Sequence, residues 1–193
     1  YNELSKGLRS PFIDSVSFGK IDMTEPAIHP QTVIGHIHLR VSDIERAVAF
    51  YTEVLGFEVQ QRWGVSAAFL SAGGYPPHIG LNPWESRGGK PPARGSTGLY
   101  HFAILFPNRK ELARAFRRLI EHEWPIDGAA DHGVSEAIYL RDPDGNGIEI
   151  YRDRPREEWP LTPNGDLAMV SERLDFEGLL GELEDEAEPA QAS

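Results

Sequence analysis

Two stretches of the chain repeat the same order of apolar and polar positions. When His36 is superposed on His101, the segment HIHLRVSDIERAVAFYTEVL lies over HFAILFPNRKELARAFRRLI. In each segment a histidine opens a run of alternating apolar residues, which is the period of a half-buried strand. Apolar residues then recur every three or four positions, which is the period of an amphipathic helix. The chain therefore contains an internal repeat whose unit begins with a strand and a helix.

Capping residues mark where both predicted helices begin. Ser42 precedes Glu45 by three positions, Asn108 precedes Glu111 by three, and both pairs fit a capping box. Three short strand patterns follow each helix. They span 57–62, 67–72 and 78–82 in the first copy, and 125–129, 136–141 and 147–152 in the second. The predicted fold is α+β, with two βαβββ modules forming a curved mixed sheet around a metal-binding cavity.

The limits of the repeat divide the chain into three predicted regions. These are an extension at 1–32, a domain at 33–160 with modules at 33–82 and 97–152, and a tail at 161–193. The extension has no sustained periodicity, and Met23 is a candidate natural start, which would make residues 1–22 a non-native leader. The tail is predicted to form a short amphipathic turn followed by an acidic, disordered end.

Composition limits the chemistry and the partners of the chain. It has 193 residues, 40% of them apolar, which is enough for one packed core. It has no cysteine, which excludes disulfides, thiolate metal sites and a cysteine nucleophile. The formal net charge of −11 disfavours nucleic acid and anionic membranes as partners. No apolar run reaches the roughly 20 residues of a membrane span and no secretory signal is recognisable, so the expected location is cytoplasmic.

Strand alternation places three candidate metal ligands away from the helices. His36 and His38 share one strand face, while Ile37 points to the other, apolar face. His101 and Glu149 likewise lie opposite the apolar positions of their strands. If the two sheets curve toward each other, His36, His101 and Glu149 converge and can hold an octahedral metal with open positions. Taken singly, each side chain is more often exposed or hydrogen-bonded than a ligand.

The motifs resemble those of a known superfamily. The segments GHIHLRVSDIERAVAFYTEVLGF, GLYHFAIL and YLRDPDGNGIEIY are similar to the vicinal oxygen chelate proteins, which include glyoxalases, bleomycin resistance proteins and extradiol dioxygenases. The resemblance covers about 33–160 and matches the family's metal ligands to His36, His101 and Glu149. The run from His132 to Glu149 resembles the type I extradiol signature, from which Ala130 departs mildly. The whole resembles one half of bacterial catechol 2,3-dioxygenase-like proteins.

This resemblance implies roles for further residues. It implies that Tyr139 hydrogen-bonds a substrate oxygen, that His132 lines the substrate pocket and that His78 acts as an acid–base group. His38 is expected in the same cavity, either in contact with substrate or in a supporting role. Gly80 stands about where glyoxalase I-like members carry a fourth ligand, which favours a three-ligand site. The implied function is an Fe(II)-dependent extradiol dioxygenase that cleaves a small aromatic diol with O2.

Two alternatives remain open from the sequence. One is another metalloenzyme of the superfamily, an isomerase, lyase or glutathione-dependent transferase that uses Mn, Ni or Zn. The other is a binding or resistance protein that sequesters a small molecule without a metal and would not need the three ligands. The sequence also leaves open the identity of the substrate and whether the modules are exchanged within a homodimer.

Overall fold

The computed structural model describes residues 28–184. All the helices and strands discussed below lie in one compact unit that begins at Gly35. The predicted leader at 1–22 and the end of the predicted tail lie outside the described residues. Within the described part of the chain, no helix has the length and apolar character needed to cross a bilayer.

The first module forms one four-stranded sheet. Its elements are β1 (Ile37–Arg40), α1 (Ile44–Ala49), a π-helical turn η1 (Phe50–Val54), β2 (Glu58–Arg62), β3 (Ala68–Ser71) and β4 (Ile79–Asn82). The strand order is β1-β4-β3-β2, with β1 parallel to β4 and the other pairs antiparallel. The helical crossover between β1 and the β2–β3–β4 meander allows the first and last strands to run parallel.

The second module repeats this topology. Its elements are β5 (Phe102–Leu105), α2 (Arg109–Glu121), β6 (Ile126–Asp131), β7 (Ser135–Arg141) and β8 (Gly147–Asp153). The order is β5-β8-β7-β6, again with the first and last strands parallel. The predicted α+β fold of two βαβββ modules is therefore confirmed, and its strands form two separate sheets of four.

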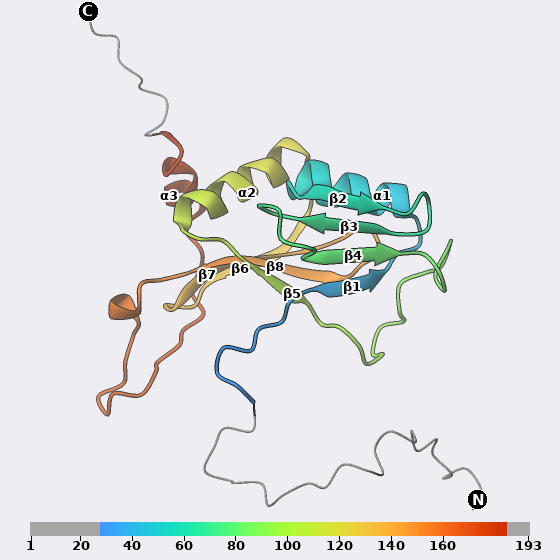
Figure 1. Cartoon of the computed structure of the whole chain (residues 1–193). Coiled ribbons are helices and arrows are strands. Elements are labelled where there is room, and N and C mark those ends of the chain that lie inside the picture. Colours follow the sequence, from blue (N-terminus) through green and yellow to red (C-terminus); the bar gives the residue numbers. More distant parts are fainter. Residues whose placement is uncertain (1–27, 185–193) are drawn as a thin grey trace, which may run out of the picture. The chain divides into compact units, whose positions relative to one another are not determined.

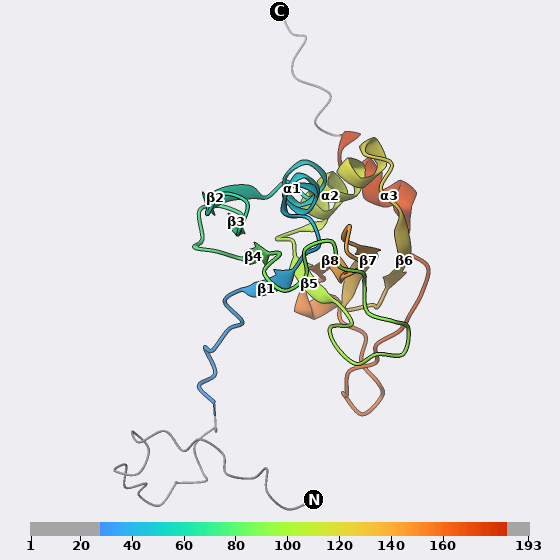
Figure 2. The same cartoon turned by 90° about the vertical axis from the view of Figure 1, so that its right-hand side faces the viewer.

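The helices cover one side of both sheets and leave the other side open (Figures 1 and 2). Alternate strand residues point to the helices and are buried with the apolar helix faces. This core includes Leu39, Leu70, Leu81, Leu112, Leu119, Ile138, Ile148 and Ile150, each no more than 7% exposed. Both views also place β1 and β5, the edge strands of the two sheets, side by side. The open faces carry the polar strand residues.

The first helix begins differently from the prediction. The side chain of Asp43, and not that of Ser42, caps α1 by accepting hydrogen bonds from the backbone N–H groups of Glu45 and Arg46. The Ser42 hydroxyl instead donates to Oδ1 of Asp144 over 2.5 Å. The second cap is as predicted, because Asn108 accepts from the N–H of Glu111.

Buried polar contacts join the two modules. The Tyr51 hydroxyl, in the helical segment of the first module, donates over 3.0 Å to Asp142, in the β7–β8 turn of the second. Burial and the Asp142 carboxylate raise the pKa of Tyr51 well above its usual value, which keeps this hydroxyl a donor. The rings of Phe50 and Trp124 pack beside it with centroids 4.5 Å apart. The DPDGNG run therefore serves as a turn that connects the modules.

A charged network lies between α2 and the second sheet. Glu136 of β7 points to the helix side, is 2% exposed and accepts from Arg152 over 2.7 Å and from Arg109 over 3.0 Å. Arg109 also reaches α3 (Phe176–Gly181), where it donates to the Gly178 carbonyl and pairs with Glu182. The network thus ties the C-terminal helix to the module.

Candidate metal and substrate site

His101 and Glu149 meet on the open face of the second sheet. His101 directly precedes β5, and Glu149 lies in the neighbouring strand β8, paired with Ala103. The Nε2 atom of His101 is 3.0 Å from Oε2 of Glu149. Two adjacent ligands of an octahedral ion with bonds of about 2.1 Å lie roughly 3.0 Å apart. An imidazole and a carboxylate at this separation fit a divalent metal as adjacent ligands.

Tyr139 and His132 extend this pair into a hydrogen-bonded series. Tyr139 is the cross-strand neighbour of Glu149, and its hydroxyl lies 3.3 Å from Oε1. His132 Nε2 lies 2.9 Å from the same hydroxyl. Burial and the charge of Glu149 raise the pKa of Tyr139 to about 12, so the phenol keeps its proton at neutral pH.

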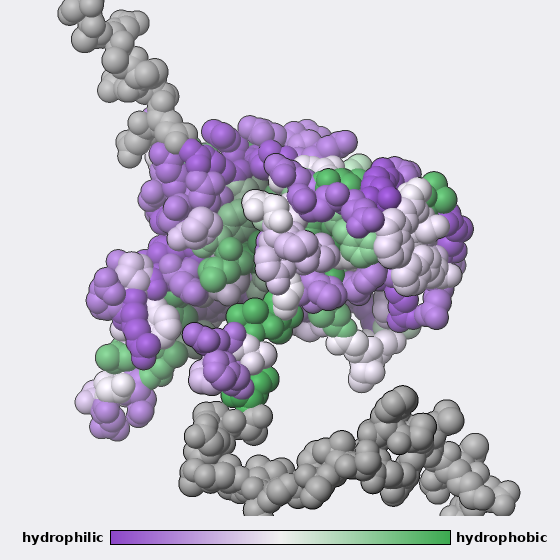
Figure 3. Space-filling view, in the orientation of Figure 1, coloured by the Kyte–Doolittle hydropathy of each residue, from purple (hydrophilic) through white to green (hydrophobic). Residues whose placement is uncertain are grey.

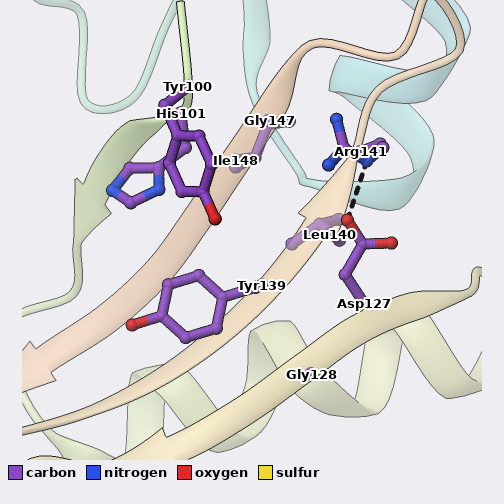
Figure 4. Close-up of a pocket in the computed structure, with 9 residues that line it drawn as sticks. All are labelled: Tyr100, His101, Asp127, Gly128, Tyr139, Leu140, Arg141, Gly147 and Ile148. Atoms are coloured by element: carbon purple, nitrogen blue, oxygen red, sulfur yellow. Dashed lines mark ion pairs between the residues drawn. The ribbon is translucent and has the colours of Figure 1, made fainter. Parts of the chain in front are cut away.

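Two of these side chains, His101 and Tyr139, border a cavity of about 370 Å³. Its lining consists of Tyr100, His101, Asp127, Gly128, Tyr139, Leu140, Arg141, Gly147 and Ile148. Figure 4 shows the rings of Tyr100, His101 and Tyr139 grouped on one side and the Arg141–Asp127 ion pair on the other. The volume suits a small molecule, and the wall combines aromatic rings with a few polar groups.

His38 lies on the open face of the first sheet, beside Gly80 of β4. A Cβ at Gly80 would lie 3.0 Å from the His38 ring, which would have to shift by a few tenths of an ångström to admit it. Asn82 accepts the N–H of Trp84 through Oδ1, which leaves its Nδ2 to donate to His38 Nε2 over 2.8 Å. Burial, and next the nearby His36, lower the pKa of His38. The neutral ring therefore carries its proton on Nδ1.

His78 lies next to the start of β1. Its carbonyl accepts from the N–H of Ile37 over 3.0 Å, and its ring stacks on Tyr75 at 4.5 Å. Its Nδ1 accepts from the N–H of Ala72 over 3.2 Å, so the neutral ring carries its proton on Nε2. The backbone of His78 is therefore hydrogen-bonded to that of Ile37, and its ring presents an N–H donor.

The structure brings some of the predicted site residues together and not others. His101, Glu149, Tyr139 and His132 form one connected group. Among residues 28–184, no three His, Cys, Asp or Glu side chains are gathered closely enough to hold a metal, so His36 does not join His101 and Glu149. His38 lies in β1 of the first sheet, and His36 and His78 directly precede its strands β1 and β4.

Sequence reasoning missed several residues of this site. Tyr100 and Arg141 line the cavity, and each could have been found from its neighbours: Tyr100 directly precedes His101, and Arg141 shares the strand face of Tyr139. Asn82, which orients His38, also follows from alternation, two positions after Gly80. Asp127 forms an ion pair with Arg141 of the neighbouring strand β7, and no local sequence pattern indicates that partner.

Two modules of this topology define the class of paired βαβββ proteins, and a histidine–carboxylate pair lies on the open sheet face of the second module. The chain belongs to the Glyoxalase/Bleomycin resistance protein/Dioxygenase superfamily, also called the vicinal oxygen chelate superfamily, whose family model matches residues 33–150.

Relatives within this superfamily differ in chemistry. The chain is 48% identical over 160 residues to the catechol-2,3-dioxygenase of Bacillus subtilis (strain 168), covering 83% of this chain and 55% of that protein. It thus spans about half the length of that relative. It is 27% identical to the glutathione transferase FosA of Serratia marcescens, covering 61% of this chain and 79% of FosA.

Solved structures share the fold. A glyoxalase/dioxygenase from Nostoc punctiforme superposes with a TM-score of 0.55 over 68% of this chain and 99% of that one, at 21% identity. Similarity at this level of identity concerns the arrangement of the strands and helices alone.

Proposed function

We propose that the chain is a metal-dependent extradiol-type dioxygenase that opens a catechol-like ring with O2. The observation that carries the proposal is the connected series of His132, Tyr139, Glu149 and His101, in which Tyr139 and His101 line a cavity. His132, Tyr139 and Glu149 belong to the run on which the sequence resembles type I extradiol enzymes, and His101 matches a metal ligand of the superfamily. The 48% identity to a catechol-2,3-dioxygenase supports this chemistry over the transferase chemistry of the more distant FosA.

His101, Glu149 and His36 would hold the metal, with Fe(II) as the first choice over Mn, Ni and Zn. When bound, it would supply a Lewis acid for the diol oxygens of the ring and an open position for O2. His36 supports this assignment by its place in the chain. It directly precedes β1 as His101 directly precedes β5, and these two strands lie side by side.

The protein's own groups would bind and orient the ring. Tyr139 keeps its proton because its pKa is about 12, so it is a neutral hydrogen-bonding group beside Glu149 at physiological pH. The aromatic side chains of Tyr100 and Tyr139 give the cavity flat apolar surfaces for an aromatic substrate. His38, held by Asn82, is a neutral polar group on the opposite sheet.

His78 is suited to donating a hydrogen bond from Nε2. Its Nδ1 is occupied by the N–H of Ala72, so taking up a proton there has to displace that contact. A fixed donor of this kind stabilises negative charge that develops on oxygen during a reaction. This geometry favours charge stabilisation over general base catalysis within the acid–base role expected for His78.

The test is anaerobic reconstitution of the purified protein with Fe(II), followed by metal analysis and O2 consumption on a panel of catechols. About one metal per chain, O2 uptake and a yellow ring-cleavage product are expected. A bound metal without O2 uptake on any diol contradicts the proposal and favours isomerase, lyase or transferase chemistry. Absence of metal binding favours a metal-free binding protein.

Replacing His78 by phenylalanine is expected to lower kcat by about 100-fold, because the Nε2–H donor is lost while an aromatic ring of similar size takes its place. Metal content should not change. The measurement is steady-state turnover of the Fe(II)-loaded protein. Tyr75→Phe is the matched control, since it keeps the ring that stacks on His78 and removes only a hydroxyl. Undiminished turnover of His78→Phe would exclude a catalytic role for His78.

Gly80→Ala is expected to raise the KM for the diol by roughly tenfold, a binding loss of about 1.4 kcal/mol. The expected cause is the added methyl, which lies 3.0 Å from the His38 ring and would shift it within its 2.8 Å contact to Asn82. Metal content and thermal stability should stay near those of the parent. Gly181→Ala, where an added Cβ meets nothing within 4 Å, is the control. An unchanged KM would show that His38 does not contact the substrate.

A further inference from the structure

A hairpin-like arm formed by residues 155–172 leaves the end of β8 and returns to the second sheet (Figure 1). It includes the 3₁₀ turn η2 (Arg156–Glu158), and a bridge between Leu161 and Leu167 closes it. Leu161, Leu167 and Met169 are 62%, 45% and 59% exposed, and Figure 3 shows apolar surface on this arm. The arm was not predicted from the sequence, which placed most of these residues in the tail.

The returning strand of the arm docks beside His132. The N–H of Val170 donates to the His132 carbonyl over 3.1 Å, and Glu172 exchanges two backbone hydrogen bonds with Asp131. Gly133 allows this close approach. Its φ is +74°, and a Cβ there would lie 2.8 Å from Pro160 and 3.3 Å from Val170. The arm is therefore packed directly against the residue that follows His132.

Both ring nitrogens of His132 are engaged. Nδ1 lies 3.1 Å from the carbonyl oxygen of Val170, and Nε2 lies 2.9 Å from the Tyr139 hydroxyl. A carbonyl oxygen can only accept, so Nδ1 must carry a proton to form this hydrogen bond. In the neutral ring, Nε2 then has a free lone pair directed at Tyr139.

The tautomer of His132 decides where the Tyr139 proton points. Tyr139 has one hydroxyl proton and two acceptors within reach, His132 Nε2 at 2.9 Å and Glu149 Oε1 at 3.3 Å. With Nδ1 protonated, Nε2 is the nearer acceptor and takes the hydroxyl proton in a hydrogen bond. The Tyr139 oxygen is then left with lone pairs for a donor in the cavity, such as a ring hydroxyl.

We propose that the arm is a positioning element of the site. The Val170 carbonyl holds His132 in the Nδ1–H tautomer, and His132 in turn orients the Tyr139 hydroxyl to accept a hydrogen bond from the substrate diol. The catalytic consequence rests on the proposed dioxygenase function, whereas the tautomer can be measured without metal or substrate. Backbone partners that set the tautomer of a site histidine are a general means of fixing its role.

The test is the ¹⁵N spectrum of histidine-labelled, metal-free protein, in which the imidazole nitrogens report which one carries the proton. A His132→Gln variant identifies the signals of His132. We expect Nδ1–H in the parent protein and loss of this preference in Gly133→Ala, which pushes Pro160 and Val170 away. Gly165→Ala is the matched control. It has φ of +85° and adds a methyl at the arm tip, where nothing lies within 4 Å, so it should retain the Nδ1–H tautomer.

A second variant keeps the test decisive if Gly133→Ala does not fold. Val170→Pro removes the N–H that donates to His132 and loosens the arm without adding a side chain at Gly133. A proton on Nε2 in the parent protein, or an unchanged Nδ1–H tautomer in the folded variants, overturns the proposal. In the Fe(II)-loaded protein, the same variants should lower kcat by about 10- to 100-fold at unchanged metal content. If the parent protein shows no turnover, the proposed function fails while the tautomer result still stands.

Discussion

Replacing His101 or Glu149 by alanine is expected to abolish Fe(II) binding and ring cleavage together. The two side chains are 3.0 Å apart and supply the imidazole and the carboxylate of the proposed metal site. Loss of either leaves too few protein ligands to hold a divalent ion against water. His36→Ala is expected to have the same effect, because His36 is the proposed third ligand. The measurements are metal content after anaerobic reconstitution and O2 uptake.

The fold should survive these substitutions. His101 and Glu149 lie on the open face of the sheet, with side chains 32% and 15% exposed, and neither belongs to the apolar core. Circular dichroism and thermal unfolding should therefore resemble those of the parent protein. His122→Ala is the control histidine variant, because His122 caps α2 on the helix side of the sheet. Stoichiometric metal in all three ligand variants would refute the assignment of the site.

Glu136→Ala is expected to cause the largest loss of stability, about 3–5 kcal/mol, because it leaves the buried Arg152 without its counter-charge. The side chains of Glu136 and Arg152 are 2% and 8% exposed. For a domain of this size the loss corresponds to a fall in Tm of roughly 10 °C. Urea unfolding and calorimetry of the metal-free protein measure it without reference to any activity.

The control for this prediction is Glu182, an exposed carboxylate that pairs with Arg109, the other arginine partner of Glu136. Glu182 pairs with Arg109 over 2.9 Å, as Glu136 does over 3.0 Å, but its side chain is 38% exposed. Glu182→Ala should cost no more than about 1 kcal/mol, because water screens an exposed pair. Equal losses in both variants would show that burial adds nothing to the contribution of Glu136.

Much of the fold could be predicted because its signals are local. The alternation in HIHLRV and YHFAIL predicts strands, and the three- and four-residue spacing that follows predicts helices. The shared period of the two segments also indicates the duplication. The pairing of His101 with Glu149 followed from the same reasoning, since alternation places both side chains on the face away from the helices.

Other features depend on residues that are distant in sequence. Ser42 fits a helix cap by its spacing to Glu45, yet its hydroxyl bonds Asp144 in the other module and Asp43 caps the helix. A rule based on sequence spacing considers only hydrogen-bond partners within the same turn of helix. It does not include a partner such as Asp144, which tertiary packing brings near Ser42. In the same way, the polar, proline-containing run after Trp159 was predicted to be a tail. In the structure it folds back, and the N–H of Val170 donates to the His132 carbonyl.

The sequence by itself determined the two βαβββ modules, their apolar faces and the set of polar residues on the open faces, because each depends on contacts within one strand or helix. Only the tertiary structure decided how those polar residues are connected. The Val170 carbonyl on His132, the His38 ring over Gly80 and the Tyr51–Asp142 bond across the modules arise from packing between segments that are far apart along the chain. Hydrogen bonds act over about 3 Å, so their partners are known only once the backbone is placed.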